Sequence, residues 1–426
     1  MKPVEAVLIG AGQRGIEAMG AFAERCPDEL KFVAVVEPIK ERRDLFAERH
    51  NIPEKLRFAS LDEFLAQPAP SKICFNATMD RQHRETAIKL MENGFHQFLE
   101  KPMDYTAEGC LAIADKAREN GLMLQICHPL RYTDFYSRVK NLIRDGAIGK
   151  LVSFTMNENV CYWHFAHSYT RGNWRNSDKS GPIILTKSCH DMDIAAWLTE
   201  SAPKKVAAFG GLDHFRKKNA PEGATKRCTD GCPAAESCPF YAPDLYLKGG
   251  PLEIWPVSMT GVIQEDEKRL EALKTSHYGR CVYHCDNNVP DHFVLSSEFE
   301  NGVSFDFTLR ADTYNCYRTI RAVGTEGTLD GHFENFEIRI SRFTSKPDPE
   351  KDVEDIHTEK LEGAHGGGDT GAIRNFVNAA RENDVDSLKR SVEIAVEGHM
   401  LAFAAEEART SEQVITLSDF KKRFRG

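Results

Sequence analysis

The sequence contains no run that approaches the ~18 consecutive apolar residues of a membrane-spanning helix. It has no basic stripe either: 55 Lys and Arg stand against 64 Asp and Glu, a net charge of −9, which argues against nucleic-acid and anionic-membrane partners. The N-terminus reaches Glu5 and then glycines at once, unlike a secretory signal. With 41% hydrophobic and 28% charged residues, we expect a soluble, cytoplasmic, globular protein.

The residue patterns divide the 426 residues into parts of different character. Up to about Cys127, short apolar runs such as VEAVLI, FVAVVEP and KICFNAT alternate with helical patterns. Strands that alternate with helices predict a parallel sheet with right-handed crossovers. We therefore expect an α/β fold that begins with a doubly wound Rossmann domain over 1–128.

The remainder, 129–426, predicts a second α/β domain. A helical segment that ends near Gly146 is followed by strand-like runs with polar alternation, two of which flank the turn Asn301-Gly302. These runs favour a large, open, mostly antiparallel sheet with helices on one face. Residues 387–409 predict a long helix with Ser387 as its N-cap. Residues 213–285 fit neither pattern and form a cysteine-rich insert.

A glycine-rich turn follows the first predicted strand. Gly10, Gly12 and Gly15 form GxGxxG between a strand and a helix, the context in which such glycines allow a tight turn and a close approach of a pyrophosphate. Glu37 ends the second predicted strand, 22 residues after Gly15. A carboxylate there accepts hydrogen bonds from ribose hydroxyls and repels a 2′-phosphate. The pattern therefore predicts NAD rather than NADP.

Longer segments match a known family. GAGQRG, AVVEPIKERRDLFAERHNI, NATMDRQHRETAIKLMENGFHQFLEKP, RYTDFYSRVKNLIRDGAIGKLVSF and HGGGD together resemble the glucose–fructose oxidoreductase/inositol dehydrogenase/MocA (Gfo/Idh/MocA) family. The match covers the whole N-terminal part and much of the second. The resemblance implies a tightly held NAD and a substrate that is a sugar, a cyclitol or a derivative. It also implies a homo-oligomer, a dimer or tetramer, often joined through the large sheet.

The resemblance further implies which residues meet the cofactor. Glu100 and Lys101 match the family's EKP triplet, with a cis bond expected before Pro102. Lys101, at the end of a parallel strand, faces the crevice where ligands bind and would relay a proton from the substrate hydroxyl. The expected cofactor-binding residues are Gly10, Gly12, Gln13, Arg14, Gly15, Glu37, Thr78, His83, Glu100, Lys101, Trp174 and Arg175.

The sequence departs from the family pattern beside the expected catalytic histidine. Dehydrogenase members usually carry an Asp four residues before it, whereas here Thr186 precedes His190 at that spacing and Lys187 stands beside it. We expect Lys101, His190 and Lys187 to be catalytic. Lys187 could stabilise an enolate or bind an anionic substrate, or it could face solvent or pair with Asp191.

A polar and aromatic segment upstream, NENVCYWHFAHSYTRGNWRN, suits a sugar pocket, in which rings stack and fixed donors meet hydroxyls. The segment HGGGD, residues 365–369, would bring a further histidine, His365, to the same pocket. The expected substrate residues are Tyr162, His164, His167, Arg171, His190 and His365.

Five of the twelve cysteines cluster in or at the end of the insert. In a reducing compartment such clustering indicates metal before disulfide. We expect a structural zinc on Cys228, Cys232, Cys238 and Cys281, with Cys285 as the alternative fourth ligand. An iron–sulfur cluster, free thiols or a disulfide remain open.

These features predict an NAD-dependent oxidoreductase that oxidises a secondary hydroxyl of a sugar, glycoside or cyclitol. The alternative is a hydrolase or lyase that oxidises its substrate only transiently, eliminates a group, adds water and reduces the ketone again. A cofactor-binding sensor without catalysis is the third hypothesis, which the EKP lysine and His190 disfavour.

Overall fold

The computed structural model describes residues 2–247, 256 and 266–424. The N-terminal part is built on a six-stranded sheet in the order β3-β2-β1-β4-β5-β6, in which every neighbouring pair is parallel. The strands are β1 (Val4–Ile9), β2 (Leu30–Val36), β3 (Arg57–Phe58), β4 (Ile73–Asn76), β5 (His96–Leu99) and β6 (Leu124–Ile126). This order confirms the predicted Rossmann sheet.

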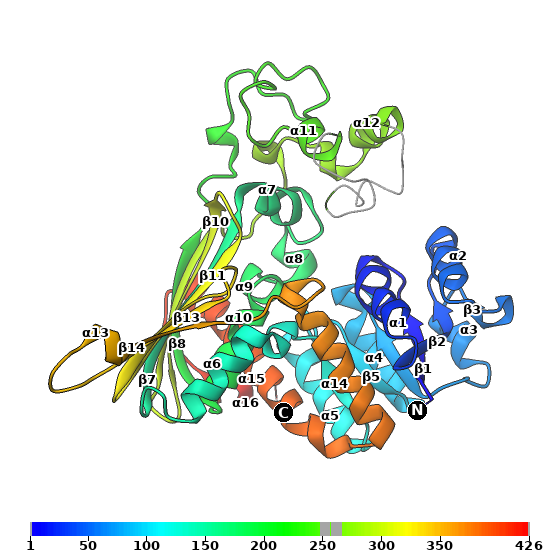
Figure 1. The fold of residues 1–426 in the computed structure, drawn as a ribbon. Coiled ribbons are helices and arrows are strands. Elements are labelled where there is room, and N and C mark those ends of the chain that lie inside the picture. Colours follow the sequence, from blue (N-terminus) through cyan, green and yellow to red (C-terminus); the bar gives the residue numbers. More distant parts are fainter. Residues whose placement is uncertain (1, 248–255, 257–265, 425–426) are drawn as a thin grey trace.

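Helices cover both faces of this sheet (Figure 1). They are a π-helical turn over Gly15–Gly20, α1 (Ala21–Arg25), α2 (Lys40–Arg49), α3 (Leu61–Leu65), α4 (His83–Glu92) and α5 (Ala107–Glu119). The sheet is a continuous apolar core because its strands are buried on both faces, with Ala6, Leu8, Phe75 and Phe98 on one of them.

The second part contains a nine-stranded sheet in the order β14-β13-β12-β11-β7-β10-β9-β8-β15. Only β7 and β10 run parallel, so the predicted, mostly antiparallel sheet is confirmed for the described residues. The strands are β7 (Leu151–Cys161), β8 (Pro203–Gly211), β9 (His292–Phe299), β10 (Ser304–Thr313), β11 (Tyr317–Gly324), β12 (Gly327–His332), β13 (Glu337–Arg342), β14 (Val353–His357) and β15 (Ile415–Thr416). The turn Asn301-Gly302 joins β9 and β10 as predicted.

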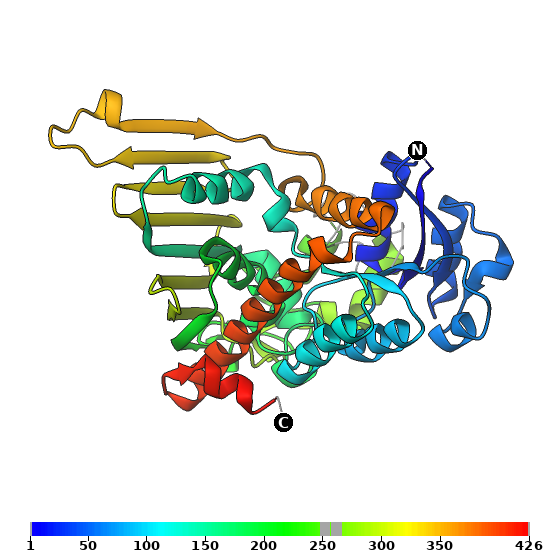
Figure 2. The same ribbon diagram turned by 90° about the horizontal axis from the view of Figure 1, so that it is seen from below.

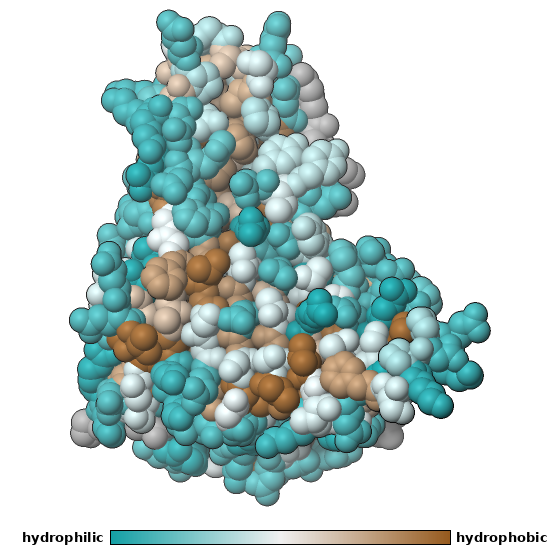
Figure 3. Space-filling model, turned by 90° about the vertical axis from the view of Figure 1, so that its left-hand side faces the viewer, coloured by the Kyte–Doolittle hydropathy of each residue, from teal (hydrophilic) through white to brown (hydrophobic). Residues whose placement is uncertain are grey.

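Helices cover the face of this sheet that is turned toward the Rossmann domain, and the other face is open (Figures 1 and 2). The helices of the second part are α6 (Asp134–Arg144), α7 (Tyr162–Phe165), α8 (Ser177–Ser180), α9 (Ile183–Thr186), α10 (Cys189–Thr199), α11 (Ala242–Leu247), α12 (Asp266–Thr275), α13 (Pro349–Asp352), α14 (Gly368–Glu382), α15 (Val385–Ser411) and α16 (Leu417–Lys422). Hydrophobic residues lie among polar ones on the open face (Figure 3), where Phe209 and Val294 are exposed cross-strand neighbours.

The last two long helices connect the two parts. Although α14 is late in the sequence, it packs on the Rossmann sheet, where Phe376 contacts Phe75 and Phe98 with ring centroids 5.5 and 5.7 Å apart. Helix α15 lies between the Rossmann helices and the large sheet (Figure 2). Its N-cap is Asp384, whose side chain accepts from the Ser387 N–H at 3.0 Å, so the predicted N-cap Ser387 is wrong by one turn.

The insert rises beyond the end of the large sheet, above α7 (Figure 1). In its described residues it holds α11, α12 and short turns, with a small core that includes Tyr246, Leu273 and Tyr278. No helix among the described residues is long and apolar enough to cross a membrane.

Candidate active site

The carboxyl ends of four parallel strands place three predicted site residues and His128 along one edge of the Rossmann sheet. Gly10 follows β1, Thr78 comes after β4, Lys101 comes after β5 and His128 comes after β6. In open α/β sheets ligands bind outside the carboxyl ends of the strands. The second domain faces the same edge through α9, α10 and the start of α14 (Figure 1).

The three glycines of the first turn meet different surroundings. Gly10 has φ +91°, and a Cβ there would lie 2.7 Å from the Ala77 carbonyl oxygen. A Cβ on Gly15 would lie 2.3 Å from the Gly10 carbonyl oxygen, so this glycine is required for the turn itself. A Cβ on Gly12 would meet nothing within 4 Å. The backbone at Gly12 is therefore open on the side where a pyrophosphate would approach.

Glu37 closes the turn from the neighbouring strand. It is buried at the end of β2, and its carboxylate accepts from the Ala11 N–H at 2.8 Å and the Ile39 N–H at 3.0 Å. Each carboxylate oxygen can accept further hydrogen bonds, as an adenosine ribose would require. The glycine-rich turn and Glu37 together fit the predicted NAD.

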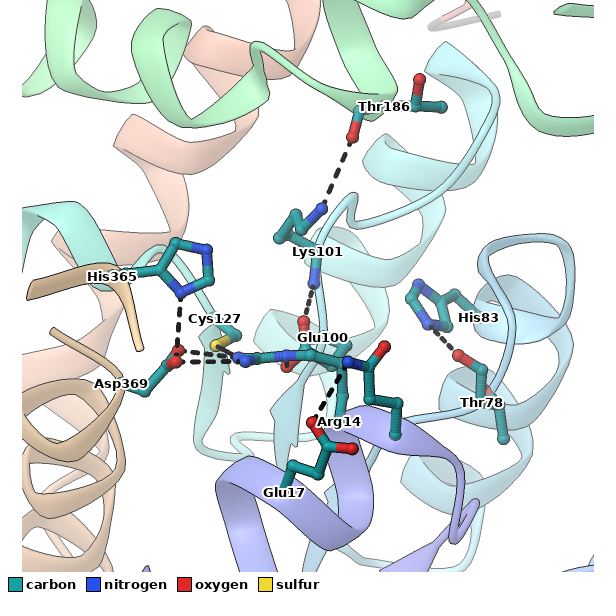
Figure 4. A network of polar contacts seen from close by, with 11 residues as sticks. Arg14, Glu17, Thr78, His83, Glu100, Lys101, Cys127, Thr186, His365 and Asp369 are labelled. Carbon is teal, nitrogen blue, oxygen red and sulfur yellow. Dashed lines mark hydrogen bonds and ion pairs between the residues drawn. The ribbon is translucent and has the colours of Figure 1, made fainter. Parts of the chain in front are cut away.

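Arg14 links the glycine-rich turn to the second domain (Figure 4). Its guanidinium donates to Glu100 at 2.8 Å and to both carboxylate oxygens of Asp369 at 2.7 and 3.1 Å. Burial alone would raise the pKa of Asp369, but the charge of Arg14, aided by His365, holds it well below its ordinary value. Arg14 therefore fixes the domains relative to each other, whereas Gln13 donates only to the nearby Glu17.

His83, at the start of α4, holds together the two loops that follow β4 and β5. It is fully buried, and its ring nitrogens lie 2.8 Å from the Pro102 carbonyl oxygen and 3.0 Å from that of Thr78. The Lys101-Pro102 bond is cis, as the resemblance implied. His83 thus positions the two segments that were predicted to meet the cofactor, and its own side chain is occupied by their backbones.

Lys101 and His190 meet at the junction of the domains. The Lys101 ammonium lies 3.4 Å from the Thr186 carbonyl oxygen, and His190 lies on the first turn of α10. Burial, together with the charge of Lys101, holds the pKa of His190 well below its ordinary value. Its Nδ1 is buried without a hydrogen-bond partner in the described residues. The arrangement gives a neutral imidazole next to a lysine, a combination suited to proton transfer.

Two further histidines surround His190. The ring of His365 lies 5.4 Å from it and that of His128 5.9 Å, measured between centroids. His365 is held by Asp369, whose Oδ2 is 3.1 Å from His365 Nδ1 (Figure 4). The structure therefore brings the HGGGD histidine to the expected catalytic histidine.

Lys187 belongs to a buried charge network, not to a single pair. It lies 3.0 Å from Glu158 on β7, and neither of the predicted alternatives, solvent or Asp191, is its partner. Arg318 on β11 contacts Glu158 as well, and its Nε donates to Asp191 at 3.0 Å. Burial raises the pKa of Asp191 to about 7; the nearby Glu158 adds to the rise and Arg318 opposes it.

The predicted substrate segment separates into two groups. Tyr162 and His164 lie in the short α7, and Tyr162 borders a cavity of about 410 Å³ with Phe240 and Tyr314. His167 and Arg171 were predicted wrongly as substrate residues, because the insert packs over them. His167 Nδ1 lies 2.6 Å from the Tyr246 hydroxyl, and Arg171, fully buried, donates to the Arg280 carbonyl oxygen at 2.7 Å.

The side chains of Trp174 and Arg175, predicted together as cofactor-binding residues, have different partners. Trp174 Nε1 donates to Asp80 at 2.8 Å, next to the loop after β4, and so reaches the cofactor edge. Arg175 turns away from that edge and pairs with Asp286 at 2.7 Å. Arg175 therefore anchors the end of the insert in this structure.

The predicted insert cysteines lie near one another, since Cys238 interacts electrostatically with Cys228 and Cys232, and Cys281 with Cys228 and Cys238, but they do not form a group as tight as a bound metal requires. Among the described residues, two groups of three have ligand atoms within 4.8 Å of one another: His128, Cys189 and His190, and Cys161, His164 and Cys316. Neither group includes an insert cysteine. The Cys228 sulfur instead accepts from Arg171 at 3.6 Å. The zinc site in the insert stays a prediction.

Sequence reasoning missed Glu158, Arg318 and His128. Glu158 lies on the same face of β7 as Phe154 and Met156, and an acidic residue in that apolar alternation is a signal for a paired charge. His128 lies two residues after the end of β6, as Lys101 does after β5, so the rule that identified Lys101 would have identified it. Arg318 lies on the buried face of β11 with Ile320 and Ala322, so a charged residue in that apolar alternation was the available signal.

The parallel sheet with its glycine-rich turn, and the Lys101–His190 pair at its carboxyl edge, define a nucleotide-dependent oxidoreductase of two domains. The chain belongs to the Gfo/Idh/MocA oxidoreductase family: residues 4–128 match its NAD-binding Rossmann fold, and residues 140–416 match its C-terminal α/β domain.

Individual relatives carry different activities. YteT of Bacillus subtilis is 26% identical over 345 residues, 76% of each chain. Two further matches are scyllo-inositol 2-dehydrogenase (NAD⁺) of B. subtilis, 28% identical over 49% of this chain, and 2,7-anhydro-N-acetylneuraminate hydratase of Mediterraneibacter gnavus, 24% identical over 50%. This chain spans only 58% and 53% of those two proteins. The structure of levoglucosan dehydrogenase with NADH and levoglucosan shares the fold, with a TM-score of 0.71, 18% identity and coverage of 98% and 100%.

Proposed function

We propose that the protein uses NAD to oxidise a secondary hydroxyl of a sugar, glycoside or cyclitol. The observation that carries this proposal is the neutral, unpartnered Nδ1 of His190 in the immediate environment of Lys101, at the carboxyl edge of the NAD-binding sheet. NAD bound at this edge accepts a hydride. The dehydrogenase relative supports the same reaction class.

The chain's own groups handle the proton. Lys101 is anchored on the Thr186 carbonyl oxygen and holds the substrate hydroxyl, and the imidazole of His190 accepts the proton as the hydride leaves. His365, fixed by Asp369, and His128 flank the His190 ring. Such positioned proton transfer contributes roughly 10²–10⁴-fold to rate.

The cationic side chains of the second domain, Lys187 and Arg318, select the substrate. Lys187 and Arg318 share the carboxylates Glu158 and Asp191, so the network is electrically neutral when both carboxylates are ionised and positive when Asp191 is protonated. Tyr162 and His164 lie at the same end of β7, where an aromatic ring and an imidazole suit a sugar.

A second function is a redox hydrolase or lyase. It is favoured by Thr186, which presents a main-chain carbonyl to Lys101 where dehydrogenase members carry a carboxylate, and by the hydratase relative. In that cycle the oxidised carbon acidifies its neighbouring C–H, a group is eliminated, water adds and the hydride returns to the ketone. No net redox change remains.

One experiment separates the two reactions. Purified protein is incubated with p-nitrophenyl glycosides and with free sugars, with NAD in trace amount, while the NADH and nitrophenolate absorbances are followed. NADH that forms in step with consumed sugar, without nitrophenolate, supports the dehydrogenase. Nitrophenolate far in excess of NAD, without lasting NADH, supports the hydrolase. If neither product forms on any substrate, the proposed function is wrong.

We extend the proposal to assembly, metal and location. The open face with Phe209 and Val294 is proposed as the interface of a homo-oligomer, which light scattering of the wild type and of Phe209→Glu tests.

Structural zinc in the insert is proposed on Cys228, Cys232, Cys238 and Cys281, and elemental analysis of Cys232→Ser tests it. The twelve free cysteines support a reducing compartment such as the cytoplasm.

A further inference from the structure

Three metal-ligating side chains meet at the insert end of the large sheet, apart from the insert cysteines. Cys161 ends β7, His164 follows three residues later in α7, and Cys316 lies in the turn between β10 and β11. The strand register explains the meeting: Thr313 on β10 is paired with Cys161, and Tyr317 on β11 is paired with Asn159. The turn that carries Cys316 therefore crosses the end of β7.

The three ligand atoms are close to one another. The Cys161 and Cys316 sulfurs are 3.0 Å apart, Cys316 Sγ is 3.6 Å from His164 Nδ1, and all three atoms lie within 4.8 Å. Zinc bonds of about 2.3 Å to sulfur and 2.0–2.1 Å to nitrogen place ligands of a tetrahedral site about 3.5–3.8 Å apart. Small side-chain rotations separate the sulfurs to that distance.

The surroundings favour the thiolate that a metal requires. The Cys161 backbone N–H donates to Cys316 Sγ at 3.2 Å. Two thiolates and a neutral imidazole balance the charge of a divalent ion, so the site needs no further counter-ion.

We propose that Cys161, His164 and Cys316 bind a zinc ion whose fourth position is open to an oxygen ligand. Thiolates with imidazole are the donors that zinc prefers, and three protein ligands leave one position free. Cys316 is exposed, so an oxygen ligand reaches that position from solvent. Lys187 and Glu158 both act on His164 electrostatically, which places the metal beside the proposed substrate network.

The test is zinc binding by the full chain, measured without substrate and so independently of the proposed activity. Protein stripped of metal under reducing, oxygen-free conditions is dialysed against zinc, and bound zinc is counted for the wild type and for Cys316→Ser, Cys161→Ser and His164→Gln. The matched control is Cys26→Ser, which removes a cysteine outside both clusters. Thermal unfolding and NAD binding confirm that each variant is folded.

We expect Cys316→Ser and Cys161→Ser to lose one equivalent of zinc that Cys26→Ser retains. Because loss of an outer-shell partner alone costs about 10–100-fold in metal affinity, His164→Gln should weaken binding at least as much. Cobalt in place of zinc should give a thiolate charge-transfer band that Cys316→Ser abolishes. Unchanged zinc stoichiometry in Cys316→Ser and Cys161→Ser would overturn the proposal. A Cys161–Cys316 disulfide in protein alkylated at cell lysis would overturn it as well.

Discussion

The ammonium nitrogen of Lys101 lies 3.4 Å from the main-chain carbonyl oxygen of Thr186. A carbonyl accepts a hydrogen bond but cannot take a proton at neutral pH, so Thr186 positions Lys101 and leaves proton transfer to other groups. His190 is the group available for it, because burial and the charge of Lys101 keep its imidazole neutral. The two residues therefore have different roles: Lys101 holds the substrate hydroxyl and His190 accepts its proton.

The glycine-rich turn gives a prediction that separates folding from cofactor binding. Gly15→Ala should destabilise the domain, because the new Cβ would lie 2.3 Å from a backbone oxygen. Gly12→Ala should leave the melting temperature unchanged, because its Cβ meets nothing within 4 Å, and yet weaken NAD binding by occupying the space of the pyrophosphate. Thermal unfolding and calorimetric titration with NAD check both variants. Equal NAD affinity in Gly12→Ala and the wild type would place the cofactor elsewhere.

The contact between Arg14 and Asp369 should stabilise the joined domains in a pH-dependent way. Asp369→Asn leaves Arg14 without its bidentate partner and should cost about 1–3 kcal/mol of unfolding free energy at pH 7. The pKa of Asp369 is lowered in the folded protein, so this stability is present above the unfolded carboxyl pKa of about 3.9 and is lost as pH falls below it.

Denaturant unfolding of the wild type and Asp369→Asn between pH 3 and pH 8 measures that difference. It should stay constant from about pH 5 upward and shrink below about pH 4. Asp178→Asn, an exposed carboxyl, is the control and should change little at any pH. A stability difference that grows as the pH falls would contradict the assignment.

Asp191 should set a pH dependence of substrate binding. Burial raises its pKa to about 7, so above that pH it ionises and cancels positive charge on Lys187 and Arg318. We expect the KM of an anionic sugar to rise above about pH 7 and that of a neutral sugar to change little. Asp191→Asn should weaken the pH dependence, as steady-state kinetics from pH 5.5 to 8.5 would show; the remainder comes from Glu334, which accepts from the Arg318 N–H and whose pKa burial also raises to about 7. A variant that keeps the wild-type profile would exclude this role.

Much of the fold was predictable because its signals are local. The strand–GxGxxG–helix order and the alternation up to Cys127 predict the parallel sheet, and polar alternation predicts the antiparallel one. Lys101 and His365 were predictable for related reasons, one as the end of a parallel strand and the other as part of a family motif. The return of α14 to the Rossmann sheet was not, because Phe376 contacts residues some 300 positions earlier.

The site was predicted less completely where side-chain direction depends on distant segments. His167 and Arg171 stand in a segment rich in sugar-binding residue types, yet the insert packs on them and turns them into its own support. Cys161 and Cys316 are 155 residues apart and meet only through the strand register. The sequence of either segment alone contains no sign of its partner.

The central claim is tested most directly by the first turnover of Lys101→Ala. Once the glycoside panel has given a substrate, wild type and variant are mixed with it and saturating NAD, and NADH formation is followed by stopped flow. At saturating NAD we expect a rate at least ~100-fold lower in Lys101→Ala, whereas Lys89→Ala, which replaces an ion-paired lysine on α4, should equal the wild type. NADH formation at the wild-type rate in Lys101→Ala would contradict the proposed mechanism.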